Sequence, residues 1–265
     1  MSRLSVWRCP INLSFTALVV FLLSSLPIVA GAVVANPTRA PQAWPTLNLP
    51  EGLSTFAIGE QVIANGMPMR MTGFVSPRKP AELSAAFRRS LGEPVVETQS
   101  NGKRVLGRAK DNFYITVQIE AGDDGYGGSA GTIAISDMEA VSKGQDQYRS
   151  DKARWLDRLP PGSSITSETV SNDNGRSGRH MVVTNMHSEA VNREAVIALL
   201  KTQGYVLERE IRADPATARK LPANMIGAVT LYLKGTDREA MAIITSAGEK
   251  TLLVINTVAT LQAYK

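Results

Sequence analysis

Apolar and polar residues alternate along Met67–Val75, and this alternation predicts a β-strand. Three methionines fall on one face of the run with period two, and the positions between them are polar or proline. Asn65-Gly66 precedes the run, and this dipeptide favours a tight hairpin turn because both central positions adopt positive φ. We therefore expect a hairpin whose first strand is Ser54–Ala64.

A helix is predicted to follow, because apolar residues recur three or four positions apart up to Leu91. Its start is ambiguous between Ser76, a good N-cap residue, and Pro80, which suits the first turn. Gly92 is expected to end it, since glycine readily adopts the left-handed conformation after the last helical residue. In a second, similar segment Ser188 is expected to cap the helix.

The remaining apolar runs predict four strands after each helix. In the first half of the chain they are Val95–Gln99, Arg104–Ala109, Phe113–Ile119 and Thr132–Ser136. In the second half they are Tyr205–Ile211, Val229–Leu233, Ala240–Thr245 and Thr251–Val258. Between the first two of the second set, Arg212–Met225 is expected to form a short helix or an ordered loop.

Two segments of the chain, Gly66–Gly92 and Gly178–Gly204, align without a gap. Seven positions are identical, and Trp44 and Trp155 occupy corresponding places upstream. A spacing of about 110 residues fits a small domain rather than a short solenoid repeat. We therefore expect an α+β fold that is a tandem duplication of a small domain. Each copy would be an antiparallel sheet with one helix packed on one face, in the order ββαββββ.

The predicted domain organisation begins with a signal peptide, or an N-terminal anchor, over residues 1–35. A proline-rich spacer over 36–50 leads to repeat domain 1 at 51–138. A linker at 139–154 then leads to repeat domain 2 at 155–265. The linker is expected there because the segment is polar and shows no apolar periodicity.

The N-terminus has the pattern of a secretory signal. Arg3 and Arg8 supply positive charge, Phe15–Leu23 supplies an apolar stretch, and small residues further on suit cleavage. The uncharged stretch from Ile11 to Ala35 is also long enough for an uncleaved anchor. With cleavage the body is expected to be periplasmic or secreted. Without cleavage it would be anchored in the inner membrane and face the periplasm.

Composition excludes several classes of protein. The only cysteine, Cys9, lies in the N-terminal segment, so cleavage would leave no disulfide, thiolate nucleophile or cysteine-ligated metal. The chain has 29 Lys and Arg against 24 Asp and Glu, and the basic residues are scattered. A nucleic-acid partner would require a concentrated basic surface with interleaved aromatic residues. No nucleic-acid partner is therefore expected.

The alternating methionines Met67, Met69 and Met71 are a candidate Cu(I) site, because thioether sulfur suits that ion. The aligned segment has Met181 and Val183 where the first segment has Met69 and Met71. The position therefore requires an apolar side chain rather than a sulfur ligand, and core packing is the preferred interpretation. No cofactor is expected.

His180 and His187 are the only histidines, and we expect them near opposite ends of one strand with side chains on opposite faces. No serine or aspartate spacing supports a catalytic triad, so no catalytic residue is assigned and the protein is not expected to be an enzyme. The two histidines are candidate interface residues. Trp44 and Trp155 are further candidates, since tryptophan is enriched in binding hot spots. Packing of each tryptophan over its own domain is the favoured alternative.

These observations lead, by elimination, to an exported, non-enzymatic envelope protein whose two homologous domains dock another envelope protein or serve a structural role. A secretion or pilus-type assembly is one such setting. Similar sheet edges in the two domains would each be able to accept a partner strand. The alternative is a periplasmic protein that binds a small ligand or copper between its domains. A hydrolase with a histidine base is a third hypothesis.

Overall fold

The computed structural model describes residues 43–122, 128–173, 175–213 and 226–260. The expected signal peptide or anchor, the first part of the proline-rich spacer and most of Arg212–Met225 lie outside these residues. Residues 43–50 have no regular secondary structure. Among the described residues, none of the helices is both long enough and apolar enough to cross a membrane.

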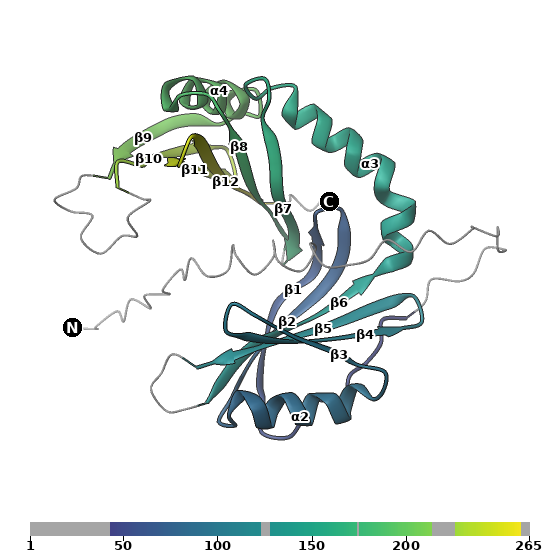
Figure 1. Cartoon of the computed structure of the whole chain (residues 1–265). Helices are drawn as coiled ribbons and strands as arrows, with labels where there is room; N and C mark the ends of the chain where they lie inside the picture. Colours follow the sequence, from purple (N-terminus) through teal and green to yellow (C-terminus); the bar gives the residue numbers. More distant parts are fainter. Residues whose placement is uncertain (1–42, 123–127, 174, 214–225, 261–265) are drawn as a thin grey trace, which may run out of the picture. The chain divides into compact units, whose positions relative to one another are not determined.

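Among the described residues, twelve strands form one antiparallel sheet (Figure 1). From one edge to the other they are β3 (Val96–Ser100), β4 (Lys103–Lys110), β5 (Phe113–Ala121), β6 (Ser129–Asp137), β2 (Met67–Ser76), β1 (Ser54–Ala64), β7 (Ser164–Asp173), β8 (Arg176–Asn185), β12 (Lys250–Thr260), β11 (Arg238–Ala247), β10 (Val229–Gly235) and β9 (Val206–Arg212). The first and last strands of this order, β3 and β9, are the edges of the sheet as far as the described residues form it.

Three helices accompany the sheet in the described part of the chain: α2 (Pro80–Leu91), α3 (Met138–Leu156) and α4 (Glu189–Lys201). α2 begins at Pro80, and Ser76 does not cap it. The hydroxyl of Ser76 accepts a hydrogen bond from the amide of Arg78, before the helix starts (3.2 Å). Gly92 ends α2 with a φ of 72°, as predicted. The predicted cap of α4 is also confirmed, because the hydroxyl of Ser188 accepts a hydrogen bond from a first-turn amide.

The predicted fold class, a tandem of small domains that each have their own sheet and helix, is wrong. Val62–Ala64 of β1 pair with Thr169–Ser171 of β7, so strands from both halves of the chain belong to a single sheet. Asn65 extends this contact, since its amide donates to the Glu168 carbonyl (2.8 Å) and its side-chain oxygen accepts from the Glu168 amide (2.7 Å). The hydrogen bonds between β1 and β7 satisfy main-chain N–H and C=O groups of both strands. Without this pairing, β1 and β7 would be two further edge strands.

The gap-free alignment does not match equivalent positions either. Gly66 lies in the turn between β1 and β2 with a φ of 81°, whereas Gly178 lies within β8. The aligned glycines are 112 residues apart, but the first residues of β2 and β8 are 109 apart. A shift by an odd number of residues turns strand side chains to the opposite face. Met69 and Met181 therefore do not share an environment, and only Met181 belongs to a core beneath a helix.

The segment expected to be a linker, 139–154, lies within α3. None of the nineteen residues of this helix is buried, which is why no apolar periodicity predicts it. Asp137 caps the helix by accepting a hydrogen bond from the Ala140 amide (2.9 Å), and Lys143 binds Glu139 one turn away (2.6 Å). A largely polar helix can be stabilised by a cap and by such side-chain pairs.

Two apolar cores hold α2 and α4 against the sheet. In the first, α2 packs on the strands through Leu83, Phe87 and Leu91, against Phe74, Leu106, Ile115, Val117, Ile119 and Ile133. In the second, α4 packs through Val196, Leu199 and Leu200, against residues that include Met181, Val183, Leu231, Ile244 and Leu253. The second core holds α4 against the part of the sheet that ends at β9.

Candidate docking site at the edge of the sheet

β9 is a terminal strand of the sheet in the described part of the chain. It pairs with β10 along one side, and none of the described strands lies along the other. Val206 is 70% exposed and Ile211 is 41% exposed. Because a terminal strand presents N–H and C=O groups that can pair with another chain, β9 is a candidate docking site.

The backbone of β9 directs alternate amides away from β10. The amide of Ala213, which directly follows the strand, donates to the Ala228 carbonyl at 2.8 Å. Because N–H groups alternate between the two sides of an antiparallel strand, the amide of Ile211 also points toward β10. The amides of Glu210 and Arg212 therefore point outward, to the side where none of the described strands lies.

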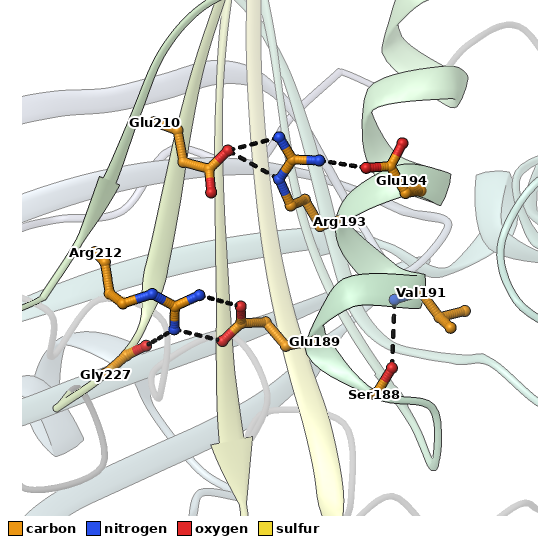
Figure 2. Close-up of polar contacts among 8 residues, drawn as sticks. All are labelled: Ser188, Glu189, Val191, Arg193, Glu194, Glu210, Arg212 and Gly227. Carbon is orange, nitrogen blue, oxygen red and sulfur yellow. Dashed lines mark hydrogen bonds and ion pairs between the residues drawn. The ribbon is translucent and has the colours of Figure 1, made fainter.

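An ion pair from α4 holds the carboxyl end of β9. Arg212 binds Glu189, the first residue of α4, through two contacts: Nη2 lies 2.5 Å from Oε1 and Nη1 lies 2.9 Å from Oε2 (Figure 2). Nη1 also donates to the Gly227 carbonyl at 3.2 Å. The hydrogen bond to Glu189 raises the pKa of Arg212, so this guanidinium stays charged. The carboxylate is favoured in the first turn of a helix by the helix dipole.

A second ion pair holds the middle of the strand. Arg193 of α4 reaches Glu210 Oε2 through both Nε and Nη2, each at 2.8 Å, and binds Glu194 through Nη1 (Figure 2). The hydrogen bond to Glu210 raises the pKa of Arg193. Partly exposed ion pairs of this kind contribute little stability individually. Together with the first pair, however, this one fixes the place of β9 against α4.

The opposite edge of the sheet has a similar arrangement. In β3, the carboxylate of Glu97 accepts hydrogen bonds from Arg88 (2.5 Å), Ser84 (2.9 Å) and Arg104 (3.1 Å). The hydrogen bonds from Arg88 and Ser84 hold the pKa of Glu97 below its ordinary value, although desolvation opposes this. Each edge strand is thus tied through a carboxylate to an arginine of a helix. β9 has seven residues and β3 has five, so β9 offers the longer edge.

The two faces of β9 differ in chemistry. Glu210 and Arg212 lie on the side of α4, where the ion pairs engage them. Arg209 and Ile211 lie on the other side, which we call the open face of β9. There the guanidinium carbon of Arg209 lies 4.6 Å from the ring centroid of Tyr232. A register shift next to Tyr232 interrupts the pairing with β10, so the regular part of β9 is its second half.

The three methionines considered as a candidate copper site lie on one face of β2. Met67, Met69 and Met71 are 9%, 5% and 4% exposed, and Phe74 faces the core under α2 from the other side of the strand. The three methionine side chains are therefore packed inside the protein. Within the described ranges, no cluster of three or more His, Cys, Asp or Glu side chains could hold a metal ion.

The two candidate tryptophans are half-buried and lie in different structural settings. Trp44 precedes β1, with its ring 5.1 Å from that of Phe113 and the Arg70 guanidinium 4.8 Å above it. Trp155 lies in the last turn of α3 and packs against the second core, with the Arg179 guanidinium 5.2 Å from its ring. Each tryptophan thus contacts the body of the protein and keeps part of its surface exposed.

The two histidines are not on one strand as expected, because β8 ends at Asn185 and His187 follows it. Nδ1 of His180 lies 2.6 Å from Oδ1 of Asn256, and its Nε2 is buried with no hydrogen-bond partner among the described residues. Nε2 of His187 lies 2.7 Å from the carbonyl oxygen of Pro161. The histidines thus contact different elements.

Trp155 also lines a pocket of about 260 Å³ together with three arginines. Each arginine already has a partner: Arg154 binds Asp151, Arg158 donates to Thr202, and Arg179 binds Glu168. Arg154 and Arg158 stand near the carboxyl end of α3, where the helix dipole favours cations. Local structure therefore explains these charges without a small-molecule ligand.

The residues that tie β9 to α4 are not among the candidates that the sequence suggests: Glu189, Arg193, Glu210 and Arg212. The sequence feature that indicates an edge strand is the run of alternating charge at residues 208–212, since charged side chains are typical of edge strands. Which helix residues meet these charges depends on the packing of α4, and periodicity does not encode that.

Comparison with known proteins gives no family assignment. No protein-family model matches the chain, and no curated protein matches it. A solved structure titled "The crystal structure of Tle4-Tli4 complex" is similar over 83% of this chain and 84% of that chain, with 12% sequence identity and a TM-score of 0.27. A TM-score this low carries no argument about function, which must be inferred from the geometry of β9 and α4.

Proposed function

We propose that this chain is an exported, non-enzymatic protein that docks another protein, and that the partner adds a strand to β9. The outward amides of Glu210 and Arg212 carry this proposal. They belong to a strand that, in the described ranges, has a neighbour on one side only. In strand addition, main-chain hydrogen bonds supply affinity, and alternate side chains supply specificity.

The ion pairs to α4 support a docking role for β9. Arg212 is held by Glu189 and Glu210 by Arg193, so the strand keeps its place before a partner arrives. A binding element that is already ordered loses less conformational entropy on association, and this favours affinity.

The charges and the bulge of β9 restrict which strands can pair with it. Edge strands with charged side chains and irregular register resist indiscriminate pairing with other chains. Glu208, Arg209, Glu210 and Arg212 place four charges along the seven-residue strand. A partner must therefore match the edge chemically, as expected of a selective docking site rather than an aggregation-prone one.

Export is part of the proposal, and it is supported by the basic, apolar and small-residue pattern of the N-terminal segment. The partner would accordingly be another envelope protein. Mass spectrometry of the protein purified from its host should find Val33 or Asn36 as the first residue. Recovery of the full-length chain from membranes would instead identify the segment as an anchor.

The docking proposal is tested by two substitutions at one position. A pull-down with the tagged chain from detergent-solubilised envelopes supplies the candidate partner, and the affinity of that partner is then measured for both variants. Glu210→Ala removes the ion pair and keeps the outward amide. Glu210→Pro also removes the amide, and an edge strand tolerates proline where its N–H faces away from the sheet.

We expect the Pro variant to bind the partner about tenfold more weakly than the Ala variant, because one main-chain hydrogen bond contributes about 1 kcal/mol and its loss leaves an acceptor unpaired. The Ala and Pro variants should have the same thermal melting profile as each other, which shows that proline does not disturb the fold. Equal affinity of the two variants would overturn strand addition at β9, whichever protein the pull-down recovers.

A further inference from the structure

The open face of β9 presents one apolar and one basic side chain at its regular end. Ile211 is β-branched and 41% exposed. Arg209 is exposed and lies over the ring of Tyr232, and no carboxylate among the described residues binds it. Arg212, on the other side of the strand, differs because its positive charge is already paired with the carboxylate of Glu189.

An added strand would bring its own side chains close to these two. Since the main-chain groups of Glu210 and Arg212 point outward, those residues would form the hydrogen-bonded pairs with the new strand. Arg209 and Ile211 would then occupy the intervening non-hydrogen-bonded positions, where opposed side chains approach most closely. Opposite charges and β-branched pairs at such positions each favour pairing, whereas like charges oppose it.

The charged residues around the open face of β9 are of both signs, so the preference for an acidic partner comes from Arg209 itself. Lys234 of β10 pairs with Val206 of β9 and is exposed on the same face. The acidic residues nearby are Glu239, the neighbour of Lys234 across β11, and Glu208 at the register shift. On the α4 side, the charged residues of β9 already form ion pairs with α4. They therefore do not select a charge of either sign on the partner strand.

Taking the proposed docking role of β9 as given, we infer that the segment it accepts carries an acidic side chain opposite Arg209 and an apolar, β-branched side chain opposite Ile211. In an antiparallel pairing, this partner strand reads apolar, any residue, acidic from its amino end. The partner is therefore an extended acidic segment of another protein, and Arg209 is the residue that selects it.

Two synthetic peptides test this inference on the full-length chain. One is the acetylated peptide Thr-Thr-Val-Thr-Glu-Thr-Thr, and the other has lysine in place of the glutamate. Fluorescence anisotropy of labelled peptides measures their affinities for the unaltered chain and for the Arg209→Glu, Glu210→Ala and Glu210→Pro variants. Arg209 lies on the exposed edge and outside both cores, so its substitution leaves the fold intact.

We expect the acidic peptide to bind the unaltered chain about threefold to tenfold more tightly than the lysine peptide. Arg209→Glu should reverse this order, and Glu210→Pro should weaken both peptides relative to Glu210→Ala. If both peptides bind equally to the unaltered chain and Glu210→Pro still weakens them, the acidic selectivity is overturned and the docking edge stands. If neither peptide binds, or if both survive Glu210→Pro, strand addition at β9 is overturned as well.

Discussion

The side chains of Asn185 and Asn192 exchange two hydrogen bonds. Nδ2 of Asn185 donates to Oδ1 of Asn192 at 2.7 Å, and Nδ2 of Asn192 donates to Oδ1 of Asn185 at 3.0 Å. Both residues are buried, at 3% and 0% exposure. The pair joins the last residue of β8 to α4, the helix that holds β9, so it links the core of the sheet to the β9 edge.

Replacing Asn192 with Leu should destabilise the protein by about 2–4 kcal/mol. The substitution leaves both polar groups of Asn185 without this partner in a buried site. It also removes the hydrogen bonds that Asn192 donates to the carbonyls of His187 and Ser188. Urea denaturation measures the change in the free energy of unfolding.

The double variant Asn185→Val, Asn192→Leu is the control for that experiment. It should cost less than the sum of the single substitutions, because no buried amide of the pair is left unmatched. Strict additivity would show that the two asparagines contribute independently, contrary to the geometry.

Glu97 should make stability depend on pH in the acidic range. Its pKa is lowered in the folded protein, chiefly by the hydrogen bond from Arg88 and then by that from Ser84. A carboxyl whose pKa falls on folding contributes stability above its unfolded pKa. That contribution is lost as the pH falls through the folded value. The difference in unfolding free energy between the unaltered chain and Glu97→Gln should therefore be constant near neutral pH and shrink below 4.5, the ordinary value.

An Arg88→Leu background provides the comparison for the pH effect. Because the main cause of the pKa shift is then absent, Glu97→Gln should change the acid part of the stability profile much less. An undiminished pH effect in that background would assign it to Ser84 or Arg104 instead.

The three methionines of β2 should behave as packing residues. Replacing Met67, Met69 and Met71 together by Leu should keep the protein folded, since volume-conserving swaps usually cost less than about 1.5 kcal/mol each. Met69→Ala should cost about 2–5 kcal/mol. Titration with Cu(I) under a competing chelator should show no tight site. Tight one-to-one binding that the Leu variant loses would establish a copper site.

The Arg193 ion pair should matter more for docking than for stability. Arg193→Met keeps most of the apolar stem and removes the contacts to Glu210 and Glu194. The free energy of unfolding should change by less than about 1 kcal/mol, because the pair is partly exposed. Partner affinity should nevertheless fall, since β9 is less ordered. A large loss of stability with unchanged affinity would contradict the role given to this arginine.

Local signals predicted the elements of this fold better than their assembly. The Asn65-Gly66 turn, the end of α2 at Gly92 and the Ser188 cap depend on residues adjacent in sequence, and the structure confirms them. The pairing of β1 with β7 joins residues more than a hundred positions apart, and no period encodes it. The sequence of α3 is typical of a linker, because the stability of this helix comes from a cap and side-chain pairs rather than from an apolar face.

The candidate site was predicted only in general terms. A sheet edge as an acceptor for a partner strand follows from the expected antiparallel architecture, but the identity of that edge does not. It depends on where β9 falls in the order of strands and on the reach of Arg193 and Arg212. The tryptophans and histidines chosen from the sequence lie elsewhere, because residue type alone does not place them on an edge.

Residue-resolved amide hydrogen exchange of β9 tests strand addition most directly. In the free chain, the outward amides of Glu210 and Arg212 should exchange quickly, and the inward amides of Ile211 and Ala213 should exchange slowly. When the partner binds, the amides of Glu210 and Arg212 should become protected, because they donate to the added strand. If the partner binds and these two amides still exchange at the rate of the free chain, β9 is not the docking site.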